Sequence, residues 1–119
     1  MRPRLLFLGL FMLLPWSVQA DDVVYERDVR PILKAHCFHC HGEEGVKEAN
    51  LDLRLAKFIK QGGDSGPSIV AGMAVDSFLL NRIESGEMPP EDKNLSRLEI
   101  ETIRKWIDQG ARTASPEPA

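Results

Sequence analysis

The chain contains only two cysteines, Cys37 and Cys40, and a histidine, His41, directly follows the second. Two cysteines form at most one bridge, which rules out the multi-disulfide framework of a disulfide-rich mini-protein. The sequence has 119 residues, enough for a single small domain. A domain of that size buries a thin core, so we expect it to need a further stabilising element, such as a large apolar cofactor.

The spacing Cys-x-x-Cys-His is typical of covalent attachment of a c-type haem. Two residues between the cysteines let one turn of chain bring both thiols to the two vinyl groups on one edge of the porphyrin. The histidine that follows then reaches the iron as the proximal ligand. The sequence therefore predicts one covalently bound haem c per chain, attached at Cys37 and Cys40 and ligated by His41.

Three other interpretations of the motif stay open. A zinc or copper site without haem normally uses two separated pairs of ligands, whereas all cysteines and histidines of this chain lie within residues 36–41. A thioredoxin-like redox pair needs a βαβ context, for which the sequence gives no sign. A Cys37–Cys40 disulfide closes a very small loop and stabilises little. Within the motif region, we expect His36 and His39 to be exposed polar residues.

The methionines are the main candidates for the sixth iron ligand. Residues 1–20 are expected to be removed, which leaves Met73 and Met88. Met88 precedes Pro89 and Pro90, which restrict its backbone to an extended form and stiffen the loop. Met73 lies in the looser sequence Ala-Gly-Met-Ala. We predict Met88 as the ligand; Met73, a histidine or an open site are the alternatives. His/Met ligation suits one-electron transfer, and an open site suits ligand binding.

The two ends of the chain differ from its middle. Residues 1–20 combine a short basic start, an apolar run from Leu5 to Trp16 and a small-residue ending, the pattern of a signal peptide cleaved after Ala20. We therefore predict an exported, periplasmic or otherwise extracytoplasmic protein, with membrane attachment only if the signal stays uncleaved. Residues 21–111 form the predicted domain, and residues 112–119 a flexible tail.

Apolar periodicity predicts about four helices and little strand. They cover residues 24–35, 56–61, 77–85 and the region after Ser96. Asp76 is expected to cap the third helix, and Ser96 with Glu99 forms a capping box for the last. We expect the first and last helices to cross through their apolar residues. These are Val29, Ile32 and Leu33 in the first helix and Leu98, Ile100, Ile103, Trp106 and Ile107 in the last. We expect Leu51, Leu53, Phe58, Phe78 and Leu79 to pack against the haem or the core.

Four segments together resemble the planctomycete-type cytochrome c domain family, which has a small all-α fold. They are residues 28–42, 50–72, 77–90 and 98–111, and they include Cys-x-x-Cys-His, Met-Pro-Pro and a terminal Trp-Ile-Asp-x-Gly-Ala. The resemblance implies thioether bonds at Cys37 and Cys40 and axial ligands His41 and Met88. It also implies that the Pro67 carbonyl accepts a hydrogen bond from the ligand histidine and so fixes the imidazole.

These inferences predict an exported monohaem carrier of single electrons, not an enzyme. In the family the domain often stands at the front of longer proteins, so the chain is either a free carrier or the electron-transfer module of a larger oxidoreductase system. Without residues 1–20 the formal net charge is -5, since 13 basic residues face 18 acidic ones. This balance excludes non-specific nucleic-acid binding and predicts redox partners with a basic docking patch. A haem-based sensing domain with an open sixth site remains the alternative.

Overall fold

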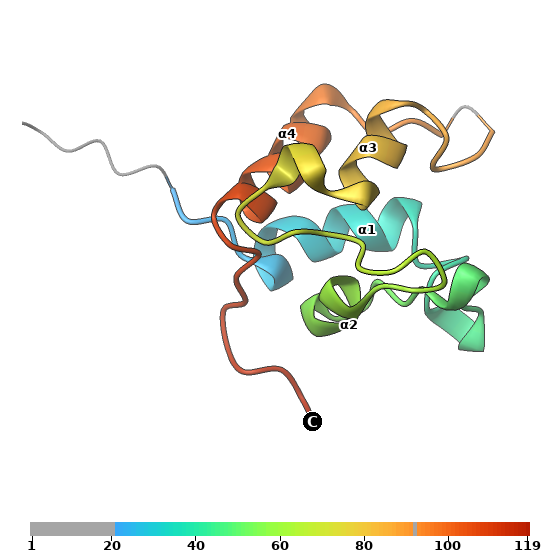
Figure 1. The fold of residues 1–119 in the computed structure, drawn as a ribbon, viewed down its shortest axis with the longest axis horizontal. Helices are drawn as coiled ribbons and strands as arrows, with labels where there is room; N and C mark the ends of the chain where they lie inside the picture. The colour runs from blue at the N-terminus through green and yellow to red at the C-terminus, as the bar shows by residue number, and fades with distance from the viewer. Residues whose placement is uncertain (1–20, 92) are drawn as a thin grey trace, which may run out of the picture.

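The computed structural model describes residues 21–91 and 93–119, and this part of the chain is helical with no β-strand. The predicted signal peptide lies outside the described residues. In Figure 1, α1 (Arg30–His36) crosses the middle of the molecule, α3 (Phe78–Glu84) and α4 (Arg97–Asp108) lie above it, and α2 (Ala56–Gln61) lies below. This arrangement confirms the prediction of a small all-α fold with about four helices. The shorter turns are η1 (Tyr25–Val29), η2 (Glu43–Gly45), η3 (Glu48–Asn50) and η4 (Ala74–Asp76).

Local sequence signals account for most helix ends. The helix predicted over residues 24–35 is η1, a π-helical turn, followed by α1, with Pro31 in the first turn of α1. α2 ends at Gly62, whose φ of 78° is one that side chains disfavour. α4 begins with the predicted capping box, in which the Ser96 hydroxyl accepts from the Glu99 amide at 3.1 Å. The Glu99 carboxylate in turn accepts from the Ser96 amide at 2.8 Å.

Two details of the predicted helices are wrong. The N-cap of α3 is Ser77 rather than Asp76, which belongs to the preceding turn η4. The Ser77 hydroxyl makes no cap bond, because it donates to the Met73 carbonyl at 3.0 Å and accepts from the Val70 amide at 3.0 Å. Leu98 does not join the core and is 77% exposed, since it lies in the first turn of α4 on the face turned to solvent.

The core fills the space between η1, α1 and α4. The rings of Tyr25 and Trp106 lie 5.8 Å apart, so the first and last helical segments pack together as predicted. The Tyr25 hydroxyl donates to the Leu53 carbonyl at 2.6 Å, and burial raises the pKa of this phenol above its usual value. The largest fully buried side chains are those of Trp106, Tyr25, Phe38, Leu33, Leu53, Ile59, Leu80, Ile103 and Ile107.

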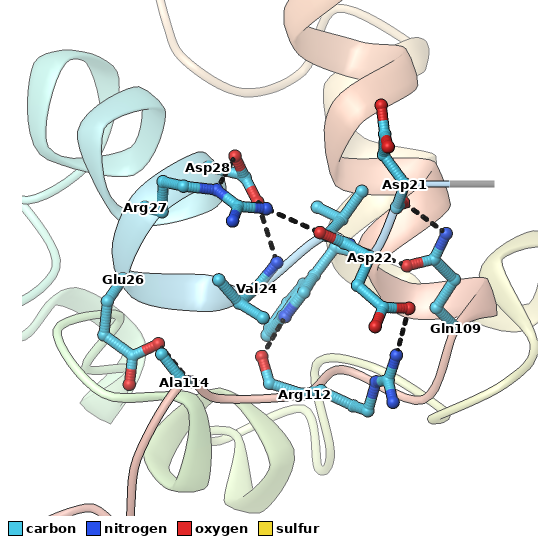
Figure 2. Close-up of polar contacts among 11 residues, drawn as sticks. Asp21, Asp22, Val24, Glu26, Arg27, Asp28, Gln109, Arg112 and Ala114 are labelled. Atoms are coloured by element: carbon cyan, nitrogen blue, oxygen red, sulfur yellow. Dashed lines mark hydrogen bonds and ion pairs between the residues drawn. The ribbon is translucent and has the colours of Figure 1, made fainter. Parts of the chain in front are cut away.

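The predicted flexible tail, residues 112–119, makes specific contacts with η1 and α2. They begin near Arg112, whose carbonyl accepts from the Trp106 indole (Figure 2).

Across the residues that the structure describes, no helix is both long and apolar enough to cross a membrane.

Candidate haem-binding site

Residues 37–41, here called the attachment turn, continue directly from α1. The amides of Cys37 and Phe38 both donate to the Leu33 carbonyl, at 2.7 and 3.0 Å. The His41 amide then donates to the Cys37 carbonyl at 3.0 Å. Phe38 is 1% exposed and anchors the turn in the core. The helix thus ends in a compact turn that carries two thiols and one imidazole.

A cavity of about 250 Å³ lies against this turn and contains most of the predicted site. Cys37, Cys40, His41 and Met88 all line it. The predicted inward leucines Leu51 and Leu53 also line it, and so do Phe78, Leu79 and Ile83 of α3. The walls are mainly apolar, which suits a flat apolar group. The remaining lining residues are His36, Glu48, Ala49, Ser65, Ser68, Arg82, Pro89 and Pro90.

The two cysteines are free thiols, both half-buried. Burial raises the pKa of the Cys37 thiol to about 11, with a smaller contribution from the neighbouring Cys40. Cys37 is therefore protonated at neutral pH. A half-buried thiol at the wall of an apolar cavity is suited to lie beside an apolar ring.

His41 has its backbone fixed on both sides. Its carbonyl accepts from the Leu53 amide at 2.9 Å, and it forms an isolated β-bridge with Lys47. Its Nδ1 atom is buried and has no hydrogen-bond partner among the described residues. Pro67 is exposed and does not line the cavity, so the predicted bond from the imidazole to the Pro67 carbonyl is not formed here. The role of Pro67 stays a prediction.

The structure separates the two methionine candidates. The Met88 amide donates to the Arg82 carbonyl at 3.1 Å, which ties the Met88 loop to α3, and Met88 lines the cavity. The following Pro89 is buried. Met73 is 49% exposed and is not among the cavity residues. Of the two thioethers, that of Met88 is at the cavity.

His36 is not the exposed residue that its sequence context predicts, whereas His39 is exposed as expected. The His36 ring is half-buried at the cavity, with Nε2 3.3 Å from a Glu99 carboxylate oxygen. The Ser96 amide, followed by the His36 ring, lowers the pKa of this carboxyl. The capping box of α4 therefore also holds the end of α1, a contact that spacing along the sequence does not reveal.

Sequence reasoning also missed Arg82, whose guanidinium is the only one among the described residues that line the cavity. It lies 4.6 Å from the centroid of the Phe78 ring and pairs with Glu87. A guanidinium is a common partner for carboxylates, so Arg82 is suited to meet acidic groups on a bound ring. The sequence does contain a signal for Arg82. It lies four residues after Phe78, and this spacing places both side chains on one face of α3.

The comparison with protein families identifies this region. A family model described as Planctomycete cytochrome C matches residues 37–92, a segment that runs from the first cysteine to just beyond Met-Pro-Pro. The match supports the planctomycete cytochrome c family for this segment. No curated protein and no solved structure matches the chain. The matched family is one of cytochromes c, and it implies covalently bound haem c and a role in electron transfer rather than catalysis.

The residues present fit that group. A cytochrome c needs two thiols for thioether bonds and an imidazole at the iron. Here these groups lie together on the wall of one mainly apolar cavity, with a thioether sulfur at the same cavity. Within residues 21–91 and 93–119, no group of three or more His, Cys, Asp or Glu could hold a metal ion.

Proposed function

We propose that the chain is an exported monohaem cytochrome c that carries one electron at a time, with His41 and Met88 as the axial iron ligands. The observation that carries the proposal is the convergence of Cys37, Cys40, His41 and Met88 on one cavity in a segment that matches the planctomycete cytochrome c family. When bound, the haem supplies an iron that alternates between the ferric and ferrous states.

The residues of the cavity have distinct roles in this proposal. Cys37 and Cys40 would hold the haem through thioether bonds, each formed when a thiol adds across a vinyl group. His41 would bind the iron through an imidazole nitrogen, and Met88 through its sulfur. The leucines at positions 51 and 53 and the α3 residues Leu79 and Ile83 exclude water from the ring. Exclusion of water and a thioether ligand both favour the reduced state.

The alternative function is a haem-based sensor with an open sixth position. Met88 is 41% exposed, and its amide makes one backbone hydrogen bond to α3. Whether its sulfur can be displaced from the iron is therefore the property that distinguishes the two functions. A ligated methionine closes the iron to small ligands, and an open site admits them.

The decisive experiment compares Met88→Ala with Met73→Ala in protein from a host that attaches haem. In the parent protein we expect sharp α and β bands after reduction, a weak far-red band after oxidation and slow, incomplete binding of carbon monoxide. Met88→Ala should keep the covalent haem, lose the far-red band and bind carbon monoxide fully. Met73→Ala is the matched control and should behave as the parent. Rapid, complete carbon monoxide binding by the parent would contradict Met88 ligation.

Partners and location are part of the same proposal. A formal net charge of -5 on the chain without residues 1–20, together with ionised haem carboxylates, favours partners that present a basic patch. Association with such a partner should slow as ionic strength rises, because salt screens the attraction. A docking rate that stays constant from low to high salt would remove this part of the proposal. Cleavage after Ala20 is checked by the N-terminal sequence of the secreted protein.

A further inference from the structure

α2 lacks a cap from its own neighbourhood. Its N-cap residue is Leu55, which has no side-chain acceptor, and its first turn contains no acidic residue. The first amides of a helix need acceptors from outside the helix. Here they find one about 60 residues later in the sequence: the two oxygens of Glu117 accept from the amides of Ala56 at 2.7 Å and Lys57 at 2.8 Å.

Glu117 reaches α2 because the preceding residues are held along the molecule. The Arg112 carbonyl accepts from both the Trp106 indole and the Tyr25 amide, each at 2.9 Å. Two residues later, the Ala114 amide donates to Glu26 at 2.7 Å. Figure 2 shows this path beside η1, together with the ion pair between Arg112 and Asp22. The tail therefore contacts α4, then η1, then α2.

The composition of the tail favours this path. Pro116 and Pro118 flank Glu117. Proline fixes its own φ and biases the residue before it toward an extended backbone, so less conformational entropy is lost when Glu117 is held at α2. Lys57 makes a second contact with the tail: its ammonium group donates to the Pro118 carbonyl, while its amide donates to the Glu117 carboxylate.

α2 in turn supports part of the cavity. The Ser68 amide donates to the Ile59 carbonyl of α2 at 3.3 Å, and Ser68 lines the cavity. Leu53, whose carbonyl accepts from Tyr25, lines it as well. We infer that residues 112–118 form a strap that closes over α2 through Glu117 and, through α2 and Ser68, holds this side of the cavity wall. The inference needs no assumption about the iron ligands.

The test is amide hydrogen exchange in the haem-loaded, full-length secreted chain, resolved by residue. Glu117→Ala should make the amides of Ala56 and Lys57 exchange about fivefold faster, the usual size of a lost helix cap. The Ser68 amide should also exchange faster, by a smaller factor, while the amides of α3 and α4 keep their rates. Glu101→Gln is the matched control, since this exposed carboxylate pairs with Arg104 and does not contact α2.

A second variant that ends after Ala114 should reproduce the same pattern at least as strongly. Three outcomes overturn the inference. Unchanged exchange at Ala56 and Lys57 means that Glu117 does not cap α2. Equal acceleration at every slowly exchanging amide means that Glu117 acts on global unfolding instead. Acceleration at Ala56 and Lys57 with an unchanged Ser68 removes the coupling to the cavity wall.

Discussion

Two parts of the cavity are built in different ways. The attachment turn is held by hydrogen bonds to residues a few positions away, and Phe38 anchors it in the core. The other part, here called the loop wall, consists of Ser65, Ser68 and Met88 and depends on contacts between distant segments. A short motif can therefore specify most of the hydrogen bonding within the attachment turn. The loop wall forms only when the rest of the chain has folded around it.

The largest expected effect tests the attachment turn. Cys37→Ala combined with Cys40→Ala removes both thioether bonds, so the secreted protein should lose all covalently bound haem. We expect no colour to remain with the polypeptide after acid–acetone extraction. His39→Ala is the matched control, because His39 lies in the same turn but is exposed, and it should retain the haem. Colour that resists extraction in the double variant would contradict attachment at these cysteines.

The second prediction tests the loop wall with one methyl group. A Cβ at Gly62 would lie 1.9 Å from the Gly66 carbonyl oxygen, where the chain turns toward Ser65 and Ser68. Gly62→Ala should therefore destabilise the protein by about 2 kcal/mol or more, measured by urea unfolding. Gly45→Ala is the control, because Gly45 has nearly the same φ, 76°, but nothing within 4 Å. Equal losses in both variants would show that backbone strain, not the close contact, sets the cost.

The third prediction concerns the capping box that also meets the attachment side of the cavity. Ser96→Ala removes the acceptor for the Glu99 amide and should lower the free energy of unfolding by about 1 kcal/mol. Glu99 then has less support where it meets His36, so the His36 ring signals should shift in the NMR spectrum. An unchanged unfolding free energy would show that the box contributes nothing to stability.

The smallest expected effect is a dependence on pH. Asp52 lies between two cavity leucines and is buried. Hydrogen bonds from Arg54 lower the pKa of its carboxyl below 3.8. The ionised form of Asp52 is therefore favoured in the folded state. Its contribution to the free energy of unfolding is present above pH 3.8 and is lost as the pH falls through the folded pKa. Asp52→Asn should flatten the dependence of the urea midpoint on pH below about 4. An unchanged slope would contradict this.

Prediction from sequence succeeded where the signal is local. The capping box at Ser96 and the glycine after α2 each depend on residues within a few positions of one another. It failed for His36 and Leu98, whose burial depends on which distant segment packs against them. The capping of α2 by Glu117 belongs to the same class, because no pattern near either residue links them.

The sequence by itself determined that Cys37, Cys40 and His41 lie in one short turn, and it determined the number and approximate bounds of the helices, because these signals act over one or two turns of chain. Only the tertiary structure decided that Arg82 lines the cavity and that the tail reaches α2. These features depend on how long loops close. A loop's course is fixed by the packing of the helices it joins, which the residues within the loop do not encode.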